Sequence, residues 1–81
     1  MGHFGITGFS AADALFVSAL QRSQAPSAGQ VRQAIDAAIR SFGGLGCAER
    51  VAQEFGDHPE AAAARMRWAR ETLAFPARLA A

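Results

Sequence analysis

Apolar residues recur along most of this chain at intervals of three and four, the spacing that places side chains on one face of an α-helix. Periodicity and turn residues together predict four helices, at about residues 11–22, 28–42, 47–55 and 59–75. The second helix has an apolar stripe of Val31, Ile35, Ala38, Ile39 and Phe42. The stripe of the third helix consists of Ala48, Val51, Ala52 and Phe55. The stripe of the fourth helix consists of Ala62, Met66, Ala69 and Leu73. The expected fold is therefore all-α, a small domain of four helices.

The first predicted helix has an unusually wide apolar face, which Leu15, Phe16 and Leu20 share with several alanines. A helix that is apolar over so much of its circumference is expected to pack on two sides. One of those sides is a candidate for contact with another subunit.

Capping residues and glycines mark the helix boundaries. Ser10 is followed three residues later by Asp13, and Ser27 by Gln30, so both serines fit the start of a capping box. The glycine-rich residues 43–46 predict a sharp break between the second and third helices.

A single glycine separates the third and fourth predicted helices. We expect Gly56 to take the positive-φ conformation that ends a helix, and Asp57 with Glu60 to form a capping box that starts the next one. Two short amphipathic helices joined by a tight turn are the minimum of a helix-turn-helix. Together with the helix at residues 28–42 they would form a trihelical core.

Residues 47–73, a third of the chain, also follow a known pattern of residue types. The matching positions are Val51-Ala52, Phe55-Gly56 before the turn, Pro59 near the start of the second helix, Arg65-Met66, Ala69-Arg70 and Leu73. In these positions the chain resembles the helix-turn-helix of the fourth region of sigma factors, particularly the extracytoplasmic-function class, and of related small bacterial regulators.

The resemblance implies a small transcription-associated regulator that binds double-stranded DNA, with a protein of the transcription machinery as a further partner. The start of the last helix would lie at the major groove, and the arginines would contact phosphates. The DNA-facing residues would then be His58, Glu60, Ala61, Ala64, Arg65, Arg67 and Arg70. Alanine offers no hydrogen-bond donor or acceptor and Glu60 has the wrong charge for phosphate, so binding would depend on phosphates and have weak base specificity.

A second hypothesis is a helical protein-interaction or homo-oligomeric module that keeps the trihelical shape without binding DNA. The net charge is only +1, whereas nucleic-acid-binding domains are usually strongly basic. A domain of 81 residues also buries little surface, which self-association would increase. The expected interface residues are Phe16, Leu20, Trp68 and Phe75.

No pattern in the sequence predicts an enzyme, a cofactor or a metal site. Cys47 and His58 are the only conventional catalytic pair, and they are expected at opposite ends of one short helix. Residues 43–46 lack the Lys-Ser/Thr that completes a phosphate-binding loop. We expect Cys47 to be a small, buried or half-buried side chain at a helix start.

The remaining segments set the expected boundaries. Residues 1–9 form a glycine-rich arm, residues 10–76 a single helical domain and residues 77–81 a short tail. Cys47 is the only cysteine, which excludes an internal disulfide, and no apolar run is long enough for a membrane span. Since no basic segment of a secretory signal is found at the N-terminus, we expect a cytoplasmic protein.

Overall fold

The computed structural model describes residues 10–74, and these residues form an all-α fold, as predicted. The elements in chain order are α1 (Ala11–Val17), a short 3₁₀ helix η2 (Arg22–Gln24), α2 (Ala28–Asp57) and α3 (Pro59–Ala74). The predicted count of four helices is not confirmed, because the second and third predicted helices are joined in α2. The predicted arm at residues 1–9, the tail at residues 77–81 and Phe75 lie outside the described residues.

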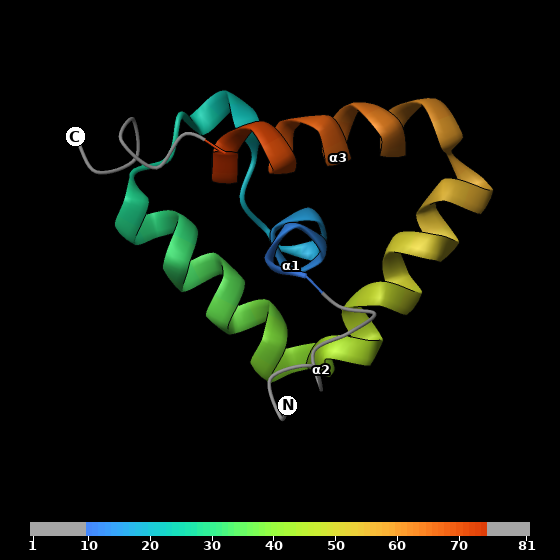
Figure 1. The fold of residues 1–81 in the computed structure, drawn as a ribbon, viewed down its shortest axis with the longest axis horizontal. Helices are drawn as coiled ribbons and strands as arrows, with labels where there is room; N and C mark the ends of the chain where they lie inside the picture. Colours follow the sequence, from blue (N-terminus) through green and yellow to red (C-terminus); the bar gives the residue numbers. More distant parts are fainter. Residues whose placement is uncertain (1–9, 75–81) are drawn as a thin grey trace.

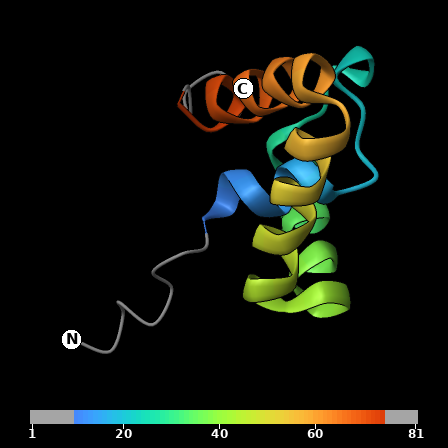
Figure 2. The ribbon, with the colours of Figure 1, turned by 90° about the vertical axis from the view of Figure 1, so that its right-hand side faces the viewer.

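The helices enclose α1. Figure 1 shows α2, bent near its middle, and α3 as the three sides of a triangle, with α1 seen end-on inside it. In the side view of Figure 2, α1 lies below α3 and beside α2. The first helix in the sequence is therefore the central helix of the fold.

Side-chain caps start α1 and α2 where the sequence predicts them. The hydroxyl of Ser10 accepts a hydrogen bond from the Asp13 amide at 3.2 Å. At the start of α2 the capping box is complete, since the Ser27 hydroxyl accepts from the Gln30 amide at 3.2 Å and the Gln30 side chain accepts from the Ser27 amide at 2.8 Å. These bonds satisfy amide groups that have no partner inside the helix.

The first helix ends at Val17, so its predicted extension to residue 22 is wrong. Ser18 ends it, because both its backbone amide, at 3.2 Å, and its hydroxyl, at 2.7 Å, donate to the Leu15 carbonyl. The same hydroxyl accepts from the Leu20 amide at 3.3 Å. A serine side chain thus replaces the hydrogen bonds that would have continued the helix.

A glycine bends α2. Gly43 has φ 72° and ψ 167°, and it divides α2 into an N-terminal arm, residues 28–42, and a C-terminal arm, residues 44–57. The predicted break at residues 43–46 is thus confirmed at Gly43, although helical geometry resumes directly after it. The arms approach closely, since a Cβ atom on Gly46 would lie 3.1 Å from the Cβ atom of Phe42.

The corner between α2 and α3 differs from the prediction. Gly56 remains helical, and Gly43 is the one glycine with positive φ in the described part of the chain. The junction is made by the backbone of His58, whose amide donates to the Glu54 carbonyl at 2.7 Å and whose carbonyl accepts from the Ala62 amide at 2.8 Å. The predicted capping box of Asp57 is not formed, because that residue is the last of α2.

The core has two clusters, and α1 contributes to both. In the larger, Leu15 and Phe16 of α1 pack with Val31 of α2 and with Ala62, Met66 and Ala69 of α3. The smaller consists of Ala14, Ala38 and Cys47. The predicted stripe of α3 is confirmed, whereas the predicted stripe of residues 48–55 is only partly buried, with Ala52 and Phe55 exposed.

We expect Gly43→Ala to lower the free energy of unfolding by about 1–3 kcal/mol, because this φ and ψ combination is open almost only to glycine. No atom lies within 4 Å of a Cβ placed on Gly43, so the cost is backbone strain alone. The matched control is Gly56→Ala, also without contacts but in helical geometry, which should stabilise by roughly 0.5–1 kcal/mol. Urea unfolding followed by circular dichroism compares them, and equal effects would contradict the assignment of the bend to Gly43.

Candidate interaction surfaces

The residues predicted to read DNA lie at the corner of α2 and α3 and along α3. His58, Glu60 and Ala61 are exposed at the corner, and Ala64 is partly buried. Arg67 and Arg70 are exposed further along α3. The start of α3 is thus exposed to solvent. The three predicted arginines do not form one exposed group, because only Arg67 and Arg70 are exposed.

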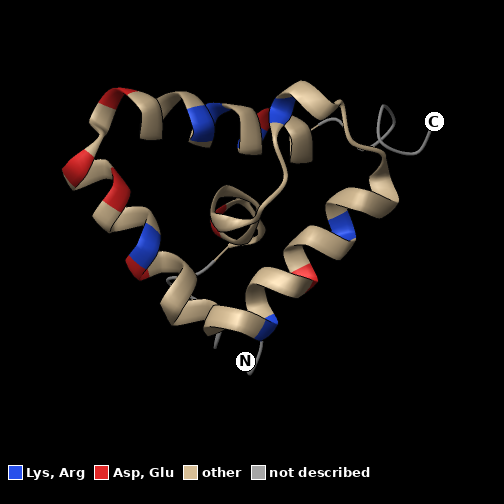
Figure 3. Ribbon diagram, turned by 180° about the vertical axis from the view of Figure 1, so that it is seen from behind, with Lys and Arg blue, Asp and Glu red and all other residues tan. Residues whose placement is uncertain are grey.

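Acidic side chains dominate this corner. Glu49, Glu54 and Asp57 are exposed on the C-terminal arm of α2, and Glu60 is exposed at the start of α3, so that red segments follow one another around the corner in Figure 3. Arg50 is the basic residue among them, and its guanidinium lies 4.0 Å above the ring of Phe42. A DNA backbone at this corner would therefore meet charges of its own sign.

Arg65 is held against the end of α1. Its Nε donates to the Phe16 carbonyl at 2.7 Å, and its Nη2 donates to the carbonyls of Leu20 at 2.7 Å and Ser18 at 3.0 Å, with a longer contact of 3.4 Å to Leu15. Burial lowers the pKa of this guanidinium from its ordinary value. These two nitrogens, which the sequence assigns to a phosphate contact as part of Arg65, are bonded to backbone carbonyls of the protein itself.

The predicted interface residues have different environments. Phe16 is only 5% exposed and its ring stacks on that of Phe55, with 6.2 Å between centroids and 18° between planes, so its assignment to an interface is wrong. Trp68 is half-buried against the core, and the Arg65 guanidinium lies 4.9 Å above its ring. Leu20 also packs against the core, but part of it lines a surface groove.

Cys47 is buried inside the bend of α2. Its thiol donates to the Ala38 carbonyl at 3.8 Å. Burial raises the pKa of the thiol above its ordinary value of 9.0, and Asp13 adds a smaller effect in the same direction. Arg50 acts in the opposite direction. The expectation of a small buried side chain is confirmed. The residue lies four positions after the non-helical Gly43, near the start of the C-terminal arm of α2. A buried thiol with a raised pKa is chemically inert.

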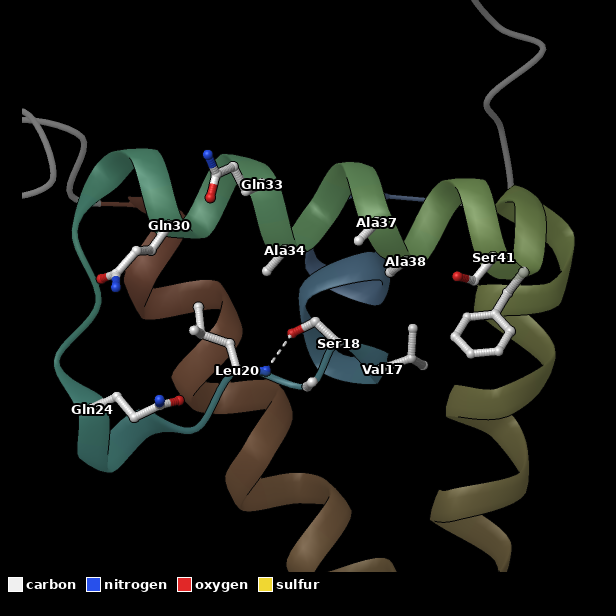
Figure 4. A pocket seen from close by; sticks show the side chains of 12 residues that line it. Val17, Ser18, Leu20, Gln24, Gln30, Gln33, Ala34, Ala37, Ala38 and Ser41 are labelled. Carbon is white, nitrogen blue, oxygen red and sulfur yellow. Dashed lines mark hydrogen bonds between the residues drawn. The ribbon is translucent and has the colours of Figure 1, made fainter.

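A groove of about 630 Å³ runs along the N-terminal arm of α2, facing the segment that follows α1. Its lining consists of Val17, Ser18, Ala19, Leu20, Gln24, Gln30, Gln33, Ala34, Ala37, Ala38, Ser41 and Phe42. Figure 4 shows Gln24 and Gln30 at one end, Val17 and Ser41 at the other, and Leu20 between them. No side chain in this lining carries a formal charge.

The sequence carries a signal for this groove in addition to its apolar stripes. Ala34, Ala37, Ala38 and Ser41 follow at i, i+3, i+4 and i+7, so they form one strip of small side chains that overlaps the apolar stripe of this helix at Ala38. Phe42, which lines the groove next to the bend of α2, is 36% exposed. Leu45, just beyond the bend, is 74% exposed and does not belong to the lining. Leu45 is the most exposed large apolar side chain that the described residues contain.

The described part of the chain offers no group of three or more His, Cys, Asp or Glu side chains that could hold a metal ion. Within residues 10–74 no helix combines the length and apolar character needed to cross a membrane. Comparisons of the chain with models of protein families, with curated proteins and with solved structures gave no match.

We expect Arg65→Met to lower the free energy of unfolding by about 2 kcal/mol, because it removes a charged donor from several backbone carbonyls while keeping an apolar stem. The control is Arg67→Met, an identical change at an exposed position two residues away, which should change stability by less than about 0.5 kcal/mol. Thermal and urea unfolding measure both. If the two variants unfold alike, Arg65 does not hold α1 in place.

Proposed function

We propose that this chain is a non-catalytic helical protein-interaction module, and that the groove along the N-terminal arm of α2 is its binding surface. The observation that carries the proposal is an uncharged, largely apolar groove whose lining includes the exposed Phe42. Exposed apolar surface next to a groove is typical of a protein-binding site.

The groove has the dimensions and chemistry for a helix. The arm of α2 that forms one wall has 15 residues, which corresponds to about 22 Å of helix. Small side chains along it allow a second backbone to approach closely, and Leu20 and Phe42 can contact apolar residues at i, i+3 and i+4 of that helix. The amides of Gln24, Gln30 and Gln33 both donate and accept, so they suit polar groups at the edge of such a helix.

The distribution of charge favours this proposal over binding at the corner of α2 and α3. Double-stranded DNA is bound chiefly through phosphates, and affinity rises with the number of basic side chains that face them. At the corner, acidic side chains outnumber Arg50, and two nitrogens of Arg65 are hydrogen-bonded to carbonyls of the protein itself.

A displayed library of amphipathic helical peptides tests the groove as a binding surface. The protein is immobilised so sparsely that its copies cannot touch, and we expect it to select peptides with uncharged apolar faces. Ala37→Glu should lower their binding by about tenfold or more, because it would bury an unpaired carboxylate in the contact.

Ala52→Glu is the matched control for this experiment. It makes the same change at an exposed alanine on the other arm of α2, outside the groove, and should leave peptide binding unchanged. Selection of no peptide above background, or equal loss in both variants, would contradict the proposed function.

A second candidate function is weak binding of double-stranded DNA by α3, favoured by Arg67 and Arg70, which are exposed three residues apart on one helix. Two phosphate contacts would make the affinity fall by about tenfold between 50 and 200 mM salt. A titration with mixed-sequence duplex, followed by Trp68 fluorescence, measures this. We expect no binding at the lower salt. Binding with that salt dependence, abolished in the double variant Arg67→Ala and Arg70→Ala, would establish the second candidate instead.

A further inference from the structure

Two glutamines at one end of the groove are held by hydrogen bonds to the backbone. The side-chain oxygen of Gln30 accepts from the Ser27 amide at 2.8 Å. In the same way, the side-chain oxygen of Gln24 accepts from the Gln21 amide at 2.7 Å. These bonds identify the atoms of each carboxamide, because a backbone amide only donates and therefore faces the oxygen and not the nitrogen.

The nitrogens of these two carboxamides remain as donors. Neither nitrogen donates to another group within residues 10–74, and both residues line the groove. Figure 4 shows Gln24 and Gln30 at one end of it, with Gln33 next to Gln30. This glutamine end, residues Gln24, Gln30 and Gln33, therefore presents N–H groups, and backbone bonds fix two of the carboxamides that carry them.

The opposite end of the groove has a different chemistry. Figure 4 shows Val17 and Ser41 there, and the apolar ring of Phe42 also belongs to the lining. The hydroxyl of Ser18 is already used, since it both donates to and accepts from the backbone of its own segment. Hydrogen-bond donors are thus concentrated at the glutamine end.

The two ends of an α-helix differ in a matching way. The carbonyls of its last turn have no partners inside the helix and need donors, whereas the amides of its first turn need acceptors. A carboxamide nitrogen only donates, so it suits the carbonyls and not the amides. The glutamine end of the groove is therefore complementary to the last turn of a helix.

We infer that the partner helix runs antiparallel to the N-terminal arm of α2 and ends at Gln24, Gln30 and Gln33, which donate to its last carbonyls. The antiparallel direction follows because Gln30 lies in the first turn of α2. The inference rests on the proposed function, because it sets the direction of the helix that binds in the same groove.

This arrangement also defines the class of partner. Carbonyls in the middle of a helix are bonded within it, so the partner segment is a helix that terminates in the groove and does not continue past it. Its last turn, the negative end of its helix dipole, would lie beside the positive end of α2.

Replacing one side-chain nitrogen by oxygen tests the donors. In Gln30→Glu the carboxylate can still accept from the Ser27 amide, as in other capping boxes, so the start of α2 is kept. The new oxygen repels a carbonyl, and we expect helical peptides selected by the wild-type protein to bind about tenfold or more weakly. A helix bound in the opposite direction would present amides there and would bind Gln30→Glu more tightly.

Gln53→Glu is the matched control for this change. Gln53 is exposed on the C-terminal arm of α2, outside the groove, so the same substitution there should leave peptide binding unchanged. Circular dichroism should show the same helicity in the wild-type protein and both variants.

Cysteine cross-linking measures the direction of the helix independently of Gln30. Gln33→Cys and Ser41→Cys place a thiol toward opposite ends of the groove, and a selected peptide is made with one cysteine at either terminus. With oxidised glutathione, the peptide with a C-terminal cysteine should link faster to Gln33→Cys, and the peptide with an N-terminal cysteine faster to Ser41→Cys. The natural Cys47 is buried and does not compete.

Unchanged or tighter peptide binding in Gln30→Glu, an equal loss in Gln53→Glu, or an equal or reversed cross-linking pattern would overturn the inference. The proposed function would still stand in these cases if Ala37→Glu, and not Ala52→Glu, weakens peptide binding. Selection of no peptide by the wild-type protein would contradict both.

Discussion

The fold depends on how the end of a very short helix is satisfied. With seven residues, α1 is far below the length at which an isolated helix is stable in water, and its last carbonyls have no partners within the helix. Arg65 donates to the carbonyls of Phe16, Ser18 and Leu20, and its positive charge lies at the negative end of the helix dipole. One side chain of α3 therefore fixes both the end of α1 and the loop that leads into α2.

Because Arg65 has this structural role, the surface of α3 around it is less suited to binding an anionic ligand. A guanidinium bonded to several carbonyls of its own chain contributes little to a phosphate site, and the nearby corner of α2 and α3 is acidic. The groove beside the N-terminal arm of α2 differs, because its lining is neutral. A charged side chain thus holds the end of α1, while apolar and small residues define the face proposed for binding.

Local signals in the sequence predicted part of the local structure. The capping box of Ser27 and Gln30 forms as expected because both partners lie within one turn of the same helix. Contacts between distant segments could not be predicted in this way. The bonds of Arg65 span 45 to 50 residues, and Phe16 is buried because α1 is enclosed by α2 and α3, not because of its own helical pattern. Gly56 remains helical although glycine readily takes positive φ, so that preference alone did not decide its conformation.

The position of α1 inside the triangle has a consequence for biosynthesis. The ribosome makes α1 first, but the helix acquires its final hydrogen bonds only from Arg65, and its hydrophobic contacts partly from Ala62, Met66 and Ala69. Contacts between residues so distant in sequence close slowly. Until α3 has left the ribosome, it cannot cover the apolar side chains of α1. Folding of this domain therefore follows the synthesis of its chain instead of accompanying it, and the nascent N-terminal half exposes an apolar segment during that time.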